Sequence, residues 1–140
     1  MADRLFSIEE ANALIPKLEL LMARLQQSAA QLRRSIEALA AETGRAANDL
    51  SGSDIVTLRP GLRPLIVEME QLVGEIEACG GEFKGLDLGL VDFPAEVDGE
   101  VVLLCWQFGE KEIAYWHALE AGFSGRKPLS RQRDRRKYLQ

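Results

Sequence analysis

The sequence predicts an α+β protein, with a long antiparallel helical hairpin packed on a small three-stranded antiparallel sheet and a basic C-terminal tail. Two segments, about 7–43 and 61–79, repeat apolar residues at spacings of three and four, which is typical of helices that pack along one stripe. Between residues 88 and 117 the apolar residues follow strand patterns, interrupted by turn residues. These observations together predict the fold class.

Composition indicates one globular domain. The chain has 140 residues, of which 46% are hydrophobic and 28% charged. We assign residues 1–125 to this domain and residues 126–140 to the tail. Residues 126–137 hold seven basic residues and one acidic residue, a net +6, so the rest of the chain carries −11 of the total formal charge of −5.

The chain shows neither a signal peptide nor an apolar run of the ~20 residues that would cross a bilayer. Its two cysteines, Cys79 and Cys105, are far apart in the sequence and form no C-x-x-C motif. Two free thiols are typical of a reducing compartment. We therefore expect a cytoplasmic protein without a membrane segment.

The ends of both helices carry recognisable signals. Ser7 and Glu10 have the spacing of a capping box, and Gly44 offers a left-handed C-terminal cap. The second helix is predicted to begin near Pro60 or Pro64 and to end at Gly80-Gly81. Residues 44–60 are rich in Asn, Ser, Gly and Pro, so we expect a flexible connection there.

The two predicted helices differ in length. Helices of about 37 and 19 residues leave an overhang of about 27 Å, because each residue adds ~1.5 Å. Unless the connection folds back, Leu32, Ile36 and Leu39 would face water. We therefore expect a homodimer in which the helices of a second subunit cover them.

Three strands are predicted, at about 88–97, 100–108 and 112–117. Asp98-Gly99 is a two-residue hairpin turn, and pairing Val97 with Glu100 places Asp92 opposite Cys105. A second turn at Glu110-Lys111 would pair Phe108 with Ile113. This second register places Cys105 opposite Trp116, with His117 on the other face of the sheet. On this register, Cys105 and His117 cannot share a proton, so we expect no catalytic cysteine.

The candidate ligand-binding residues are the polar and aromatic groups of this segment: Asp87, Asp92, Glu110, Trp116, His117 and Arg126. Asp92 is expected in the middle of a mixed face, where a buried carboxylate needs a partner such as Trp116, a backbone amide or Arg126. The candidate metal ligands are His117, Asp92 and Glu120. No recognised ligand spacing supports them, and His117 equally fits a structural histidine with a local hydrogen bond. We predict no catalytic residue and name no cofactor.

The basic tail raises the possibility of nucleic-acid binding. Tyr138 is its only aromatic residue, and the acidic remainder of the chain would repel phosphates. We favour instead a solubilising tail, or an arm that holds the acidic body of a neighbouring subunit.

Several segments resemble a known family. They are F-S-I-E-E-A-N-A-L-I-P near the N-terminus, K-G-L-D-L-G-L-V-D-F-P, V-L-L-C-W and Y-W-H-A-L-E-A-G-F-S-G-R. Together they resemble the uncharacterised prokaryotic family called domain of unknown function 2203. The resemblance covers most of the chain and is weakest over residues 40–62 and after Leu129. It implies a prokaryotic setting, but no activity, ligand or catalytic residue.

Two hypotheses about function follow. The first is a small dimeric, non-enzymatic module that acts through protein contacts. The second is a ligand- or metal-binding protein, or an enzyme, with a carboxylate and histidine site at the end of the sheet. The two hypotheses make different predictions about the candidate residues. In a binding protein or enzyme these residues would converge on an open cleft, whereas in an interaction module each would have its own hydrogen-bond partner.

Overall fold

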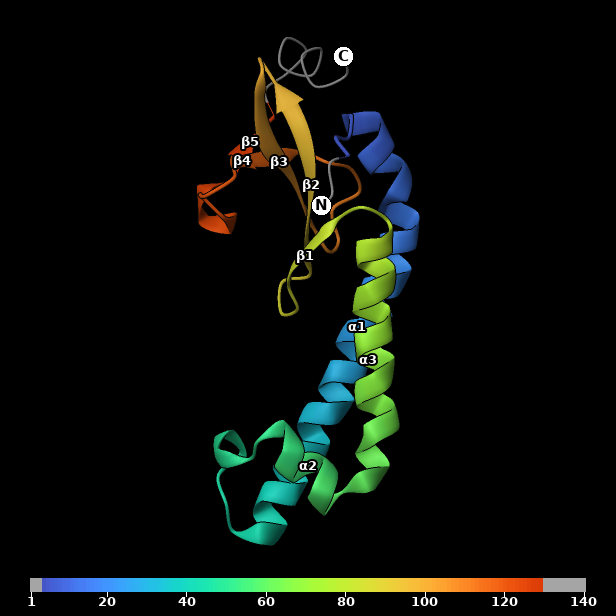
Figure 1. The fold of residues 1–140 in the computed structure, drawn as a ribbon, viewed down its shortest axis with the longest axis vertical. Coiled ribbons are helices and arrows are strands. Elements are labelled where there is room, and N and C mark those ends of the chain that lie inside the picture. Colours follow the sequence, from blue (N-terminus) through green and yellow to red (C-terminus); the bar gives the residue numbers. More distant parts are fainter. Residues whose placement is uncertain (1–3, 130–140) are drawn as a thin grey trace.

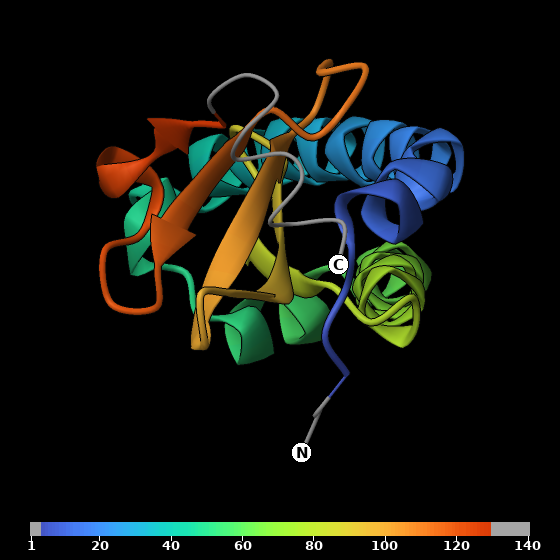
Figure 2. The same ribbon diagram turned by 90° about the horizontal axis from the view of Figure 1, so that it is seen from above.

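The structure, a computed structural model, describes residues 4–129. Its frame is a pair of helices, α1 (Ile8–Thr43) and α3 (Arg63–Ala78), which lie side by side (Figure 1). A sheet and a short helical connection lie at opposite ends of α1. The view from above shows α3 end-on beside the N-terminal end of α1, with the strands to one side (Figure 2). The α+β class is therefore confirmed.

The ends of α1 form as the sequence predicts. The Ser7 side chain accepts a hydrogen bond from the Glu10 amide at 3.0 Å, and the Glu10 carboxylate accepts one from the Ser7 amide at 2.9 Å. Gly44 ends the helix with φ of 73°. A side chain at that φ would be strained, so glycine suits the position.

The connection after α1 is folded, which corrects the prediction of a flexible segment. It contains two 3-10 turns, Ala47–Asp49 (η1) and Pro60–Leu62 (η2), and a short helix, Gly52–Leu58 (α2). A second capping box, Ser51 with Asp54, starts α2. Backbone and side-chain hydrogen bonds from Ser51 lower the pKa of Asp54. The cap therefore keeps its negative charge at the helix N-terminus.

The connection also covers the overhang of α1, which has 36 residues against 16 in α3. Leu39, Ala40, Leu50 and Ile55 form a second core there, with Ile36 packed against it. Leu39 is only 3% exposed. The overhang therefore gives no reason for a second subunit at Leu39, because residues of the same chain bury it.

The sheet has five antiparallel strands in the order β1-β2-β3-β4-β5. They are β1 (Glu82–Gly85), β2 (Leu90–Val97), β3 (Glu100–Gln107), β4 (Tyr115–Ala118) and β5 (Lys127–Pro128). The three predicted strands correspond to β2, β3 and β4, and the prediction missed the two short outer strands. β5 begins inside the segment assigned to the basic tail, while residues 130–140 lie outside the described residues.

The first hairpin has the predicted register. Val97 pairs with Glu100 and Asp92 with Cys105, around a turn with φ of 53° at Asp98 and 84° at Gly99. One face of this hairpin packs on the first half of α1 and on α3. The main core there joins helix residues Leu18, Met22, Leu25, Leu72 and Ile76 to strand residues Val91, Phe93, Leu104 and Trp106.

The second hairpin is displaced by one residue from the prediction. Cys105 pairs with Tyr115 and Leu103 with His117, so the predicted pairing of Cys105 with Trp116 is wrong. No two-residue turn forms at Glu110-Lys111, because residues 108–114 make a longer loop with its own partners. The Ile113 amide donates to the Asn12 side chain at 2.6 Å, and the Trp106 indole donates to the Glu110 carbonyl at 2.9 Å.

A displacement of one residue exchanges the faces of β4, since strand side chains alternate. Trp116 now lies on the helix-facing side, opposite Leu104, and packs against the main core. His117 lies on the same face as Cys105 and Asp92.

Among residues 4–129, no helix combines the length and apolar character that a membrane crossing requires.

Truncation of Ile55 tests whether α2 covers the end of α1. Ile55 is 7% exposed in the second core, while Leu58 in the same helix is 44% exposed. We expect Ile55→Ala to lower the free energy of unfolding by about 2–4 kcal/mol and Leu58→Ala by less than about 1 kcal/mol. Urea denaturation followed by circular dichroism measures both. Equal effects would mean that α2 does not dock as described.

Candidate functional site

Three chemically active side chains meet at the centre of the sheet. Asp92 on β2, Cys105 on β3 and His117 on β4 project from the same face, and their donor atoms all lie within 4.8 Å of one another. Their exposed fractions are 2%, 1% and 1%, respectively. We call this trio the polar centre. It is a closed site inside the domain.

The carboxylate of Asp92 has partners on two other strands, the adjacent β1 and, across β3, β4. Its Oδ2 lies 2.9 Å from His117 Nε2 and 3.3 Å from Lys84 Nζ, which comes from β1. The expected partners Trp116 and Arg126 lie elsewhere. Burial acts to lower the pKa of Lys84, but the Asp92 and Glu82 carboxylates outweigh it and raise that pKa. The Lys84 ammonium therefore stays charged beside Asp92.

The Cys105 thiol is not placed as a nucleophile. Burial, with a further contribution from the Asp92 carboxylate, raises its pKa to about 12. Nucleophilic cysteines need a lowered pKa and access to solvent. Both His117 ring nitrogens already have oxygen partners, Ala118 O at 2.8 Å and Asp92 Oδ2. The predicted separation of Cys105 and His117 onto opposite faces is wrong, but the geometry still gives no thiol–base pair.

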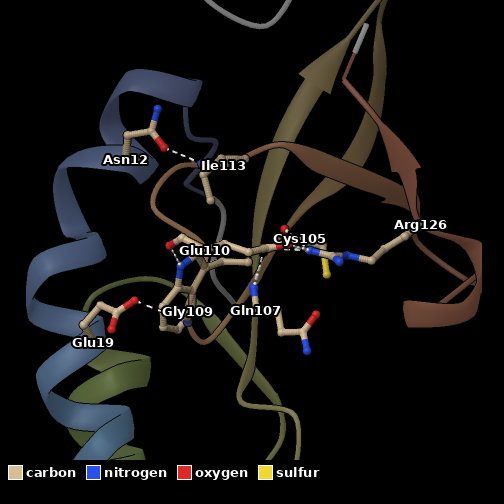
Figure 3. Close-up of polar contacts among 9 residues, drawn as sticks. Asn12, Glu19, Cys105, Gln107, Gly109, Glu110, Ile113 and Arg126 are labelled. Atoms are coloured by element: carbon tan, nitrogen blue, oxygen red, sulfur yellow. Dashed lines mark hydrogen bonds and ion pairs between the residues drawn. The ribbon is translucent and has the colours of Figure 1, made fainter.

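A second polar pair, Glu110 with Arg126, lies beside Cys105 of the polar centre (Figure 3). One Arg126 nitrogen donates to both Glu110 carboxylate oxygens, at 2.7 and 2.8 Å, and to the Cys105 carbonyl at 3.2 Å. The guanidinium also lies over the Tyr115 ring, 4.0 Å from its centroid. Burial opposes the charge of Arg126, but hydrogen bonds to Glu110 and Cys105 raise its pKa. The pair thus ties the loop before β4 to the segment before β5.

Helix α1 holds the other side of the same loop (Figure 3). Its Asn12 side chain accepts from the Ile113 amide, and its Glu19 carboxylate accepts from the Gly109 amide at 3.3 Å. The Glu110 carboxylate also accepts from the Gln107 amide at 2.8 Å. These contacts account for the loop that replaces the predicted tight turn.

The remaining predicted site residues do not join the polar centre. The Asp87 side chain is 89% exposed and lies 3.9 Å from Arg33. Glu120 is exposed in the turn after β4. Trp116 faces the core side of the sheet, with Lys127 Nζ 5.1 Å from its ring centroid. The predicted set therefore separates into two contacting pairs, Asp92 with His117 and Glu110 with Arg126, and three residues outside both.

Sequence reasoning missed Cys105 as a member of the trio. The first hairpin register correctly placed it opposite Asp92. Only the incorrect second register separated it from His117. A thiol, an imidazole and a carboxylate are together a donor set for transition metals such as zinc.

A large open hollow of the described surface lies elsewhere, along the seam between α1 and α3. It consists of two adjoining pockets of about 400 and 430 Å³, which share Leu32, Met69 and Leu86. We call it the seam groove. Its lining is mostly apolar: Leu25, Leu32, Ile36, Ile66, Met69, Val73, Phe83 and Leu86, with Arg33, Glu37 and Glu70 among the polar residues.

Comparison with known proteins gives a family without a described activity. A family profile described as "Uncharacterized conserved protein (DUF2203)" matches residues 4–129. The chain belongs to this family. No curated protein and no solved structure matches the chain. The family resemblance noted from the sequence is therefore confirmed, and the site has to be interpreted from its own chemistry.

Thiol labelling tests the burial of Cys105. Cys79 is partly exposed, whereas Cys105 is 1% exposed and has a pKa of about 12. With a chromogenic disulfide reagent near neutral pH, we expect one rapidly reacting thiol in the native protein and two after denaturation. In Cys79→Ser, the rapid reaction should disappear. A rapid reaction that remains in this variant would show that Cys105 is accessible.

The pair of Glu110 and Arg126 should contribute measurably to stability. Their side chains are 22% and 12% exposed, whereas those of Glu42 and Arg59, a surface pair, are 60% and 41% exposed. We expect Glu110→Gln to cost about 1.5–3 kcal/mol and Glu42→Gln less than about 1 kcal/mol. Urea denaturation of both variants measures the difference. Similar small costs would show that the buried pair does not hold the loop.

Proposed function

We propose that this protein is a dimeric, non-enzymatic interaction module and that its seam groove is the surface of contact. The observation that supports this proposal is the contrast between two sites. The groove is open and apolar, while the polar centre, where chemistry would be expected, is at most 2% exposed. A substrate would need an open path to those groups, whereas a protein partner needs an accessible apolar surface.

The shape and lining of the groove favour a helix as the bound element. It follows the junction of two helices, and Phe83 and Leu86 come from β1 and the turn after it. Apolar grooves between helices bind the apolar face of a further helix in many complexes. Since lining residues such as Leu32 and Met69 are only partly buried, a partner would remove more of their apolar surface from water.

A second copy of this chain is the partner that we propose. The lining of the groove includes both signs of charge, with Arg33 and Glu37 on α1 and Glu70 on α3. A two-fold axis places the same surface of two copies face to face, so that Arg33 of one copy can lie opposite an acidic residue of the other. The homodimer through helices thus remains the proposal, now supported by the groove and no longer by the overhang.

The proposed setting is the cytoplasm of a prokaryote. Both cysteines are free thiols, which agrees with a reducing compartment. The net charge of −5 argues against nucleic acid as the main partner. Other proteins remain possible partners of the same groove. The basic residues of 130–140 lie outside the described part of the chain, so the proposal does not depend on the tail.

The alternative function is a ligand- or metal-binding protein, or an enzyme, with a carboxylate and histidine site. The contact between Asp92 and His117 favours its metal-binding form. Its enzymatic form lacks support, because the same residues are closed to solvent. Binding of a small ion at the polar centre is compatible with dimer formation at the seam groove.

Two lysine substitutions on α1 test the dimer. Leu32 lines both pockets of the groove, while Leu20 is 69% exposed and lines neither. We expect wild-type protein and Leu20→Lys to have a dimer mass at micromolar concentration and Leu32→Lys to have a monomer mass. A charge in the groove would be desolvated by the partner, which disfavours association. Size-exclusion chromatography with light scattering measures the mass.

A monomer mass for the wild type across the concentration series would contradict the proposal. So would a dimer that survives Leu32→Lys, or one that Leu20→Lys abolishes. Circular dichroism of each variant controls for loss of the fold.

A further inference from the structure

We propose that Asp92, Cys105 and His117 bind one divalent transition-metal ion, of which zinc is the best fit. The inference goes beyond the proposed dimer and does not depend on it. It is based on four observations: the convergence of three donor types, the hydrogen-bond roles of His117, an unpartnered oxygen on Asp92, and a cation that already lies against the site.

The two ring nitrogens of His117 set the first constraint. Nδ1 lies 2.8 Å from the Ala118 carbonyl oxygen, which can only accept a hydrogen bond, so Nδ1 carries a hydrogen. In a neutral ring, Nε2 then presents a lone pair to Asp92 Oδ2, only 2.9 Å away. Two acceptors at this distance repel each other unless a positive species lies between them. The site therefore holds either a proton or a metal ion at this point.

The arrangement of His117 is also the one that metal-binding histidines use. Such a histidine binds the metal through one nitrogen and donates the other N–H to a carbonyl or carboxylate, which fixes the ring. Here the Ala118 carbonyl performs the second role. Nε2 is thus directed at the polar centre by a contact within its own strand.

The unpartnered oxygen of Asp92 is the second constraint. Asp92 is 2% exposed, and its Oδ1 has no hydrogen-bond partner. Buried carboxylate oxygens are normally satisfied, because desolvation without a partner destabilises the fold. Coordination of a metal ion by Oδ1, alone or together with Oδ2, would supply the missing interaction.

The donor set selects the class of metal. Zinc binds thiolate, imidazole and carboxylate, at ~2.0–2.3 Å, whereas magnesium and calcium prefer oxygen ligands alone. Ligands of a tetrahedral zinc ion lie roughly 3.3–3.8 Å apart. Since the three donor atoms here lie within 4.8 Å of one another, small side-chain adjustments would bring them to that spacing.

Charge balance also favours a divalent ion. Binding of M²⁺ by a thiolate, a carboxylate and a neutral imidazole would release the thiol proton and any proton between Nε2 and Oδ2. The ion and its three ligands then have a net charge of zero, which limits the cost of burying them.

A metal ion would reach the polar centre from the side of the sheet on which Lys84 lies. Its Nζ lies 3.3 Å from Asp92 Oδ2 and 3.3 Å from Glu82 Oε1. The Lys84 and Glu82 side chains are 39% and 46% exposed, while the Asp92 side chain is 3% exposed. The ammonium group therefore stands between the polar centre and solvent and competes with a metal ion for Asp92.

Cobalt binding tests the site, because a thiolate ligand gives Co²⁺ a charge-transfer band in the near ultraviolet. We expect wild-type protein to bind one Co²⁺ with this band and to release it to Zn²⁺. Cys105→Ser should lose the band and bind at least about 100-fold more weakly. Cys79→Ser, which removes the other thiol, should bind as the wild type does. Zinc should raise the melting temperature of wild type and Cys79→Ser, but not of Cys105→Ser.

Replacement of Lys84 gives a test outside the buried trio. We expect Lys84→Met to tighten metal binding by about 5-fold, since it removes a competing cation. Lys17→Met, on the exposed face of α1, should leave the affinity unchanged. Isothermal titration calorimetry with Zn²⁺ measures both.

Failure of the wild type to bind Co²⁺ or Zn²⁺ at micromolar concentration would overturn the proposal, as would a charge-transfer band that survives Cys105→Ser. An affinity that Lys84→Met leaves unchanged or weakens would also contradict the site as described. If Cys105→Ser does not fold, the cobalt spectrum of Cys79→Ser still decides whether Cys105 is a ligand, because Cys105 is then the only thiol.

Discussion

The pairing of β4 with β3 is the constraint on which the rest of the C-terminal half depends. This register places His117 beside Asp92 and turns Trp116 toward the helices. It is stabilised from two sides, by the Asn12 side chain on α1 and by the Glu110–Arg126 pair. A displacement by one residue would move an imidazole into the apolar core and an indole onto the polar face. The loop contacts and the burial pattern therefore favour the same arrangement.

Much of the fold was predictable because its signals are local. The Ser7–Glu10 cap, Gly44 and the Asp98-Gly99 turn each depend on residues within a few positions of one another. Their effects are consequently visible in a short stretch of sequence. The pairing of Asp92 with Cys105 followed directly from the turn, so the relative position of two of the three residues of the polar centre was correct from the sequence.

The parts that were not predictable depend on distant residues. The Ile113 amide finds its acceptor on Asn12, 101 residues away, and no local pattern indicates that contact. Lys84 reaches Asp92 from β1, an outer strand of four residues, too short to show a clear alternation. The helix α2 is only seven residues long and contains Gly52, so its composition resembled a loop. Its burial against Leu39 outweighs weak propensity.

The two cores have a consequence for how the molecule opens. The main core joins the sheet to the first half of α1, while Leu39, Leu50 and Ile55 form a separate cluster around the far end of the same helix. The parts of a protein that unfold cooperatively often coincide with such clusters. A part held by a small cluster unfolds at a lower free energy than a part held by a large one. The far end of α1 can therefore unfold together with α2 while the sheet stays intact. Amide hydrogens of α2 would then exchange with solvent without global unfolding, and one continuous helix would belong to two units of different stability.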